Sequence, residues 1–250
     1  MKILLVGALR YVEINKIIEA LQDKEEINFT LCDCYKGKIG NNEIMVCHSS
    51  VGVVNAASSA TVCIENFHPD YVIDAGCAGG YGDMHKGYIV VSEKSFNIGS
   101  IKSENDFIPG VTDIFHRRMF TFKEDDYDIV NHNEILSEED NDVYYQKCSD
   151  YIISKAKEIK NEFNKTIVFG NTGSGDVWNC NKEMINFMSK KFNILCEAIE
   201  GHSVITVANR YNIPACEIRI ISNNNVLDEP YDRNISLEMQ DFVIRLLEVM

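Results

Sequence analysis

Basic residues are scarce in this chain. Against 38 Asp and Glu it carries only 24 Lys and Arg, for a formal net charge of -14. An acidic protein repels nucleic-acid phosphates and anionic membranes unless it has a local basic stripe. The short basic groups Arg117-Arg118 and Lys190-Lys191 are typical of ordinary solvated surface. We therefore expect no nucleic-acid partner and no membrane partner.

Long apolar segments are also missing, and we expect no cleavable leader. The chain enters an apolar run at residues 3–6 directly, no small-residue cleavage site follows, and no later stretch approaches the length of a membrane span. A cytoplasmic location is the default expectation.

The nine cysteines form no CxxC pair, are odd in number and lie mostly inside apolar runs. This usage is typical of reduced thiols in a core. His48 and His202 have no metal-ligand spacing with other His or Cys residues. The sequence therefore predicts neither a metal site nor a cofactor.

Length and hydrophobic content favour one large core. The chain has 250 residues, 45% of them hydrophobic, with no internal repeat or linker. We expect a single domain over residues 1–250. Strand-like and helix-like patterns alternate, which predicts an α/β fold with a mostly parallel sheet.

The predicted elements are as follows. Strands are expected at residues 3–6, 28–34, 43–48, 71–75, 87–92, 166–169 and 216–221, helices at 14–21, 52–64, 143–163, 200–211 and 235–249, and turns at 36–42 and 76–80. The acidic, irregular residues 123–142 are expected to form a surface loop or lid.

Two polar candidates stand out in the otherwise apolar segment 195–223. Glu200 follows an apolar run and opens a helical pattern, and Asn223 follows the strand-like run 216–221. Open α/β sheets bind ligands at such strand ends. The alternative is that Glu200 is a helix-start carboxylate favoured by the helix dipole and that the asparagines form a turn.

Six short motifs in order resemble those of the nucleoside phosphorylase and nucleosidase family. They are GAL at 7–9, SSVGVVNAA at 49–57, DAGCAGG at 74–80, GYIVVSE at 87–93, GSGD at 173–176 and the unit at 200–223. The chain is most similar to the hydrolytic branch with methylthioadenosine/S-adenosylhomocysteine nucleosidase and futalosine hydrolase. The resemblance implies a three-layer α/β/α sandwich with a central mixed, partly barrel-like sheet. It also implies a nucleosidase that hydrolyses the N-glycosidic bond of a purine ribonucleoside.

The resemblance assigns the ribose end of the site. Glu200 matches the glutamate that holds the ribose hydroxyls, where a carboxylate stabilises the cation-like sugar of the transition state. The family's Glu-Met-Glu pattern is Ala198-Ile199-Glu200 here, so its first carboxylate is absent, with Glu197 one place away. Ile199 keeps an apolar wall under the sugar.

At the base end, Asn223 stands where adenine-specific members carry a proton-donating aspartate. An amide cannot donate a catalytic proton, but its NH2 can donate hydrogen bonds to O6 and N7 of a 6-oxopurine. The resemblance therefore favours a 6-oxopurine, on a ribose whose 5' end is either plain or modified. The alternative is that Asn223 marks a divergent or inactive member.

The rest of the pocket follows from the same resemblance. Cys77, Ala78 and Gly79 would line it beside C1' and the base. Trp178 would stack on the purine, unless it is a plain core tryptophan. Asp176 in the same loop is expected to be structural.

Hydrolysis needs a carboxylate that activates water. The nearest match to the family's glutamate base is Glu13. It stands one residue after the position that the resemblance predicts, which Val12 occupies here. One residue of helix rotates a side chain by about 100°. Phosphorolysis would need cations. Asp74 stands where phosphorylases carry an arginine and would repel phosphate, while Arg10 matches their other arginine poorly.

Two alternatives to the nucleosidase stay open: a phosphate-dependent phosphorylase and a nucleoside-binding protein without catalysis. Arg219 is expected to form a buried ion pair with a carboxylate. The resemblance also implies a homo-oligomer, most simply a dimer, whose neighbouring subunit completes the 5' end of the pocket together with residues 96–122.

Overall fold

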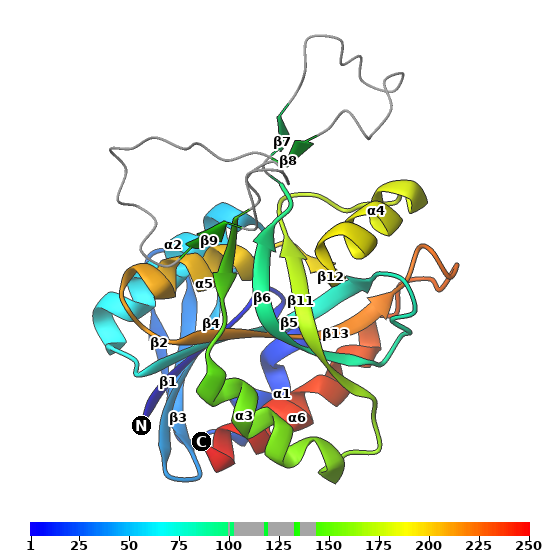
Figure 1. Cartoon of the computed structure of the whole chain (residues 1–250). Coiled ribbons are helices and arrows are strands. Elements are labelled where there is room, and N and C mark those ends of the chain that lie inside the picture. Colours follow the sequence, from blue (N-terminus) through cyan, green and yellow to red (C-terminus); the bar gives the residue numbers. More distant parts are fainter. Residues whose placement is uncertain (100, 103–117, 120–132, 136–143) are drawn as a thin grey trace.

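One mixed sheet runs through the molecule, and helices cover both of its faces (Figure 1). The structure is a computed structural model that describes residues 1–99, 101–102, 118–119, 133–135 and 144–250. The described strands are β1 (Lys2–Gly7), β2 (Gln22–Asn28), β3 (Asp33–Ile39), β4 (Asn42–His48), β5 (Tyr71–Gly80), β6 (Ile89–Asn97), β7 (Ile101–Lys102), β8 (Arg118–Met119), β9 (Asn133–Ile135), β10 (Tyr144–Lys147), β11 (Ile167–Ser174), β12 (Ile194–Ala198) and β13 (Ala215–Asn223).

The described helices are the π-helical turn η1 (Arg10–Ile14), α1 (Asn15–Ala20), α2 (Val53–Phe67), α3 (Asp150–Ile159), the 3-10 turn η3 (Lys160–Glu162), α4 (Lys182–Phe192), α5 (Gly201–Arg210), the 3-10 turn η4 (Arg233–Ile235) and α6 (Ser236–Val249). Within the described residues, no helix combines the length and the apolar character that a membrane crossing needs.

Several strands of the sheet close into a ring. β5 pairs with β12, β12 with β11, β11 with β6, β6 with β13, and β13 pairs back with β5. The order β2-β3-β4-β1 continues the sheet beyond β5, and β10-β9 continues it beyond β6. The three-layer sandwich with a mixed, partly barrel-like sheet is therefore confirmed. The expectation of a mostly parallel sheet is wrong, because six of the eleven described strand pairings in this sheet are antiparallel.

Alternate residues of the central strands face two separate cores. In β1, Ile3 and Leu5 pack into the core shared with α1, α3 and α6, whereas Leu4 and Val6 pack into the core shared with α2 and α5. All four side chains are fully buried. Figure 1 shows α2 and α5 above the central strands and α1, α3 and α6 below them. Continuous apolar runs in the sequence are the consequence of burial on both faces.

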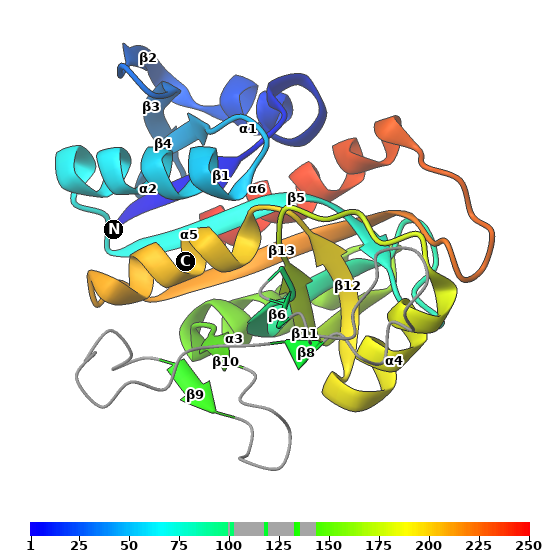
Figure 2. The same cartoon turned by 90° about the horizontal axis from the view of Figure 1, so that it is seen from above.

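Helix α2 presents small residues to α5, and the two helices lie side by side (Figure 2). Ala56 and Ala60 of α2 are fully buried, and small side chains allow helices to approach closely. This confirms the small-residue helix expected at 52–64. The approach also brings the start of α2 to the start of α5, where Gly52 N donates to Glu200 Oε1 over 3.0 Å.

The strands of the N-terminal hairpins are displaced from their predicted positions. Strand β2 occupies residues 22–28 instead of 28–34, and β3 extends over residues 36–39, the first part of the segment 36–42 where a turn was expected. The turn lies at Gly40, whose φ is 57°. β2 escapes sequence analysis because it is the edge strand of the sheet and mostly exposed, so it lacks an apolar pattern.

The glycine-rich segment 76–80, predicted as a turn, is the second half of strand β5. A Cβ at Gly76 would lie 2.7 Å from both Glu13 Oε1 and Arg219 Nη1, and one at Gly80 would collide with the carbonyl oxygen of Met84. These glycines therefore allow neighbouring groups to approach the backbone of β5 closely, and they do not change the chain direction.

The predicted helix 143–163 begins as a strand. Residues 144–147 form β10, which pairs with β6 and β9, and α3 starts only after Ser149, whose hydroxyl accepts from Ile152 N. The strands predicted at 87–92 and 166–169 are longer and extend to Asn97 and Ser174. The acidic loop expected at 123–142 lies outside the described residues except for the short strand β9.

Candidate active site

A cavity of about 190 Å³ opens where β1, β5, β12 and β13 end. Residues after β4 and β11 and Tyr231 complete its described walls. All eight site residues singled out from the sequence line this cavity: Glu13, Cys77, Ala78, Gly79, Trp178, Ile199, Glu200 and Asn223. The fold thus brings together candidates from opposite ends of the chain.

Glu200 precedes α5 and is 7% exposed. Its Oε1 accepts from Gly52 N, while its Oε2 has no hydrogen-bond partner among the described residues. Burial raises the pKa of Glu200 to about 7, and the nearby Glu13 and Asp176 charges add to the effect. Glu200 therefore offers one free carboxylate oxygen to the cavity and changes charge near neutral pH.

Three backbone amides hold the Glu13 carboxylate. Its Oε2 accepts from Ala8 N over 3.0 Å and from Leu9 N over 2.9 Å, and its Oε1 accepts from Cys77 N over 2.8 Å. Burial raises the pKa of Glu13, although these amides and Arg219 act in the opposite direction. A carboxylate with a raised pKa that is already fixed beside a cavity is suited to accept a proton from water.

Glu13 lies within the π-helical turn η1 and lines the cavity, although it stands one residue late in the motif. A π-turn contains one more residue than an α-turn, so it shifts the side chains that follow by one position. Val12, at the place expected from the family pattern, does not line the cavity.

Arg219 forms a buried ion-pair network next to Glu13. Its Nη2 donates to Asp74 Oδ2, and its Nε lies 3.2 Å from Glu217 Oε2. Burial raises the pKa of Glu217 to about 7 and lowers the pKa of Arg219 to about 10. The ion pair expected for Arg219 is present, and it links β13 to β5 directly behind the cavity.

Gly201, the residue after Glu200, provides the space for this network. A Cβ at Gly201 would collide with Glu217 Oε2 and lie 2.6 Å from Arg219 Nη2. Because no side chain intervenes, α5 begins directly against the ion pair. The glycine that follows the candidate ribose glutamate is therefore a packing requirement.

Asn223 ends β13 with its side chain 4% exposed at the cavity wall. The Ser222 hydroxyl lies 3.1 Å from Asn223 Oδ1, and Nδ2 makes no hydrogen bond with the described residues. An unpaired amide donor at a cavity wall is available to a ligand acceptor.

Glu197 is a cavity residue that the sequence-based site omitted. Tyr81 Oη donates to its Oε2 over 2.7 Å, and Asn179 N donates to its Oε1 over 2.8 Å. Burial raises the pKa of Glu197. A Cβ on Gly79 would lie 3.5 Å from Asn223 Nδ2 and 3.6 Å from Glu197 Cγ, so both groups flank that glycine. The signal for it was a carboxylate inside the otherwise apolar strand 194–198.

Trp178 lines the cavity with 58% of its surface exposed, which excludes the alternative of a plain core tryptophan. Its ring meets that of Tyr231 edge to face, with centroids 5.9 Å apart. The neighbouring Asp176 accepts from Val53 N over 2.9 Å at the start of α2, the structural role expected for it.

Cations are absent from the described cavity wall, which carries three glutamates and no Lys, Arg or His. Asp74 is also absent from it, because this carboxylate is buried and paired with Arg219. The expectation that Asp74 would repel phosphate is therefore wrong, because this carboxylate does not reach the cavity and its charge is paired. Arg10 does not line the described cavity either. Its guanidinium lies against Tyr35 instead, 5.0 Å from the centre of the ring.

Comparisons with known proteins agree with the motif order. The family model described as the phosphorylase superfamily matches residues 2–249. A curated 5'-methylthioadenosine/S-adenosylhomocysteine nucleosidase from Geobacillus sp. (strain WCH70) is 24% identical over 258 residues, covering 99% of this chain and 98% of that protein.

Solved structures show the same fold. A 5'-methylthioadenosine/S-adenosylhomocysteine nucleosidase from Neisseria meningitidis, in complex with methylthio-immucillin-A, superposes with a TM-score of 0.77 at 17% identity, covering 100% of this chain and 99% of that one. A futalosine hydrolase mutant from Helicobacter pylori strain 26695 superposes with a TM-score of 0.74 at 23% identity, covering both chains completely.

The exposed Trp178 makes ligand binding visible in fluorescence. As the only tryptophan in the chain, it reports on the cavity alone, and we expect a purine nucleoside that stacks on it to quench its emission. Titration of the wild type with inosine tests this, with ribose as the ligand without a base and Trp178→Phe as the variant without the reporter. Unchanged emission while equilibrium dialysis shows bound inosine would contradict the stacking role.

Proposed function

This chain belongs to the phosphorylase superfamily, and we propose that it acts there as a nucleosidase that hydrolyses the N-glycosidic bond of a purine ribonucleoside. One observation carries the proposal: the described cavity wall holds three buried glutamates and no cationic side chain. The nucleosidase name of a relative aligned over 99% of this chain also supports it.

Water fits the described cavity better than phosphate as the attacking group. Phosphate binding requires cationic or bidentate donors, and Glu13, Glu197 and Glu200 would repel a dianion. Water requires a small space and a base. Glu13, fixed by three amides, is proposed as that base.

The sugar would be held by Glu200. Its free Oε2 accepts from a ribose hydroxyl, and its charge stabilises the positive charge that develops on the sugar as the bond to the base breaks. Because that charge is larger in the transition state than in the ground state, Glu200 accelerates the reaction and does more than bind substrate. Ile199 lines the cavity beside it as an apolar wall.

The base end favours a 6-oxopurine. Asn223 Nδ2 offers a donor for O6 or N7, and Glu197 offers an acceptor for the N1–H that a 6-oxopurine carries and adenine lacks. Glu197 orients the base through N1–H, Asn223 Nδ2 donates to the negative charge that develops on the leaving base, and the departing purine takes up its proton from solvent. Trp178 lies at the same cavity and would supply the stacking surface.

Loss of the Glu200 carboxylate should remove activity. We expect Glu200→Gln to lower kcat/KM by about 10²–10³-fold, the usual effect of removing one group that stabilises charge in the transition state. The measurement is chromatographic detection of hypoxanthine released from inosine and futalosine without phosphate. The control is Glu183→Gln, which alters an exposed glutamate of α4.

The pH profile of the same assay gives a second check on Glu200. Since its pKa is raised to about 7 and the ionised form holds the sugar, wild-type kcat/KM should rise from pH 6 to pH 8.

Strict dependence on phosphate would make the protein a phosphorylase. Binding of nucleosides without release of any base would make it a binding protein.

Exchange of the amide at the base end should change base preference. Asn223→Asp introduces a group that can protonate N7 of adenine, and it removes the donor to O6. We expect this variant to gain adenine release from methylthioadenosine and to lose hypoxanthine release from inosine. Asn234→Asp, the same exchange at an exposed position, is the control. A wild type that releases adenine as readily as hypoxanthine would refute the role given to Asn223.

We also propose that the protein forms a homodimer through the apolar side chains near the cavity. Tyr11, Val51 and Val54 are exposed, and Val51 lines the cavity itself. Light scattering after gel filtration should give twice the chain mass of 28.4 kDa. Val54→Glu should give a monomer, whereas Leu237→Glu on the opposite helix layer should not. A monomeric wild type at micromolar concentration would contradict the dimer.

A further inference from the structure

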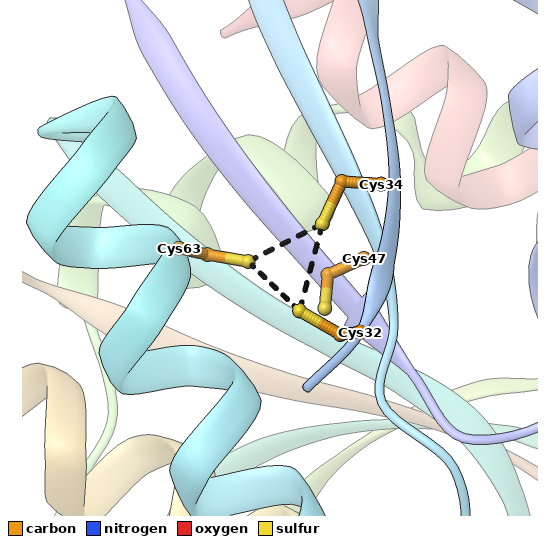
Figure 3. Close-up of side chains that lie close together, drawn as sticks. All are labelled: Cys32, Cys34, Cys47 and Cys63. Carbon is orange, nitrogen blue, oxygen red and sulfur yellow. Dashed lines mark hydrogen bonds between the residues drawn. The ribbon is translucent and has the colours of Figure 1, made fainter. Parts of the chain in front are cut away.

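Four of the nine cysteines converge at one point outside the cavity (Figure 3). Cys32 precedes β3, Cys34 lies on β3, Cys47 on β4 and Cys63 on α2. Their sulfur atoms all lie within 4.8 Å of one another, and all four residues are buried. We call this group the four-cysteine cluster.

Strand pairing assembles the cluster. Cys34 and Cys47 are directly opposite each other in the antiparallel pair of β3 and β4. Cys32 lies two residues before Cys34, which directs both side chains toward the same side of the sheet. Helix α2 covers that side and directs Cys63 onto them, as Figure 3 shows.

Three of the sulfurs are spaced as in a tetrahedral metal site, and the fourth, that of Cys47, lies within 4.8 Å of each of them. The Sγ–Sγ distances are 3.4 Å for Cys34–Cys63, 3.8 Å for Cys32–Cys34 and 3.9 Å for Cys32–Cys63. A zinc ion bound by four thiolates at about 2.3 Å requires sulfurs about 3.8 Å apart. A disulfide requires about 2.05 Å, so none of these pairs is bonded.

The polar contacts of the cluster distinguish it from ordinary core thiols. Elsewhere in the core, the Cys216 thiol donates to the carbonyl oxygen of Ser92 over 3.4 Å. In the cluster, the sulfurs of Cys32, Cys34 and Cys63 contact one another in pairs. Four sulfurs that gather in an apolar core form a site in which a shared cation would satisfy all of them.

A buried hydroxyl lies next to the cluster. Ser59 is one helical turn before Cys63 on α2, is fully buried, and its Oγ has no hydrogen-bond partner among the described side chains and backbone. The Ser59 hydroxyl lies near Cys32 and helps to lower the pKa of that thiol, after the larger effects of the neighbouring cysteines. Metal-bound thiolates commonly accept hydrogen bonds from such groups.

We propose that Cys32, Cys34, Cys47 and Cys63 bind one structural Zn²⁺ in tetrahedral thiolate coordination. Zinc binding converts four thiols to thiolates and releases their four protons to solvent, with no change of oxidation state. All four positions around the ion are then filled by protein, which is the pattern of a structural site and leaves no position for substrate. This inference is independent of the proposed function.

The ion would join the edge strands β3 and β4 to helix α2. Cys47 and Cys63 lie on either side of the segment 49–52, whose last residue, Gly52, donates to Glu200. Zinc bound at the cluster therefore fixes the element that carries this donor. Its removal should lower the melting temperature of the protein.

Elemental analysis tests the proposal. Wild-type protein purified under reducing conditions without chelator should contain about one zinc per chain. Cys34→Ser and Cys63→Ser should each lose most of that zinc, whereas Cys148→Ser, which changes a buried cysteine outside the cluster, should retain it. Zinc retained in both cluster variants would overturn the assignment.

A measurement on the wild type covers the case in which the cluster variants fail to fold. Metal-free protein loaded with Co²⁺ should show the visible absorption of tetrahedral thiolate coordination, and added Zn²⁺ should remove it. In the zinc-loaded native protein, a thiol reagent should release the metal together with the modification of four cysteines. Stoichiometric iron in place of zinc, or a folded wild type that takes up neither Zn²⁺ nor Co²⁺, would overturn the proposal.

Discussion

The buried ion pair between Arg219 of β13 and Asp74 of β5, extended to Glu217, determines how the strands behind the cavity can pair. Three charges in a dry interior are tolerable only if each has a partner. A slip of one residue between these strands would turn the side chains to opposite faces and separate the charges. The register that places Asn223 beside Gly79 and lets α5 start at Gly201 therefore depends on this network.

The same network sets the electrostatics of the cavity. Arg219 lowers the pKa of Glu13, but its charge is already paired with Asp74 and Glu217. Glu13, Glu197 and Glu200 are therefore buried without a cation of their own, and burial raises the pKa of each. Such a site favours a neutral nucleophile and stabilises positive charge on a bound molecule, the two requirements of nucleoside hydrolysis.

Much of the fold could be predicted from the sequence, and the exceptions share a cause. Strand 216–221 and the helix that begins after Glu200 follow from apolar patterns that are continuous in the chain. Strands β2 and β10 did not follow, because edge position and pairing with distant strands define them. The glycines of β5 were taken for a turn because their crowding by Glu13 and Arg219 involves residues far away in the chain.

The sequence by itself indicated the family and, through that resemblance, the α/β/α architecture and candidates for eight of the residues that line the cavity, because short motifs are local properties of the chain. Only the tertiary structure decided that Glu13 reaches the cavity, that Glu197 belongs to it and that Arg219 pairs with Asp74. The four-cysteine cluster is the clearest case. No spacing relates Cys34 to Cys47 and Cys63, and strand register and helix packing alone set the distances between their sulfurs.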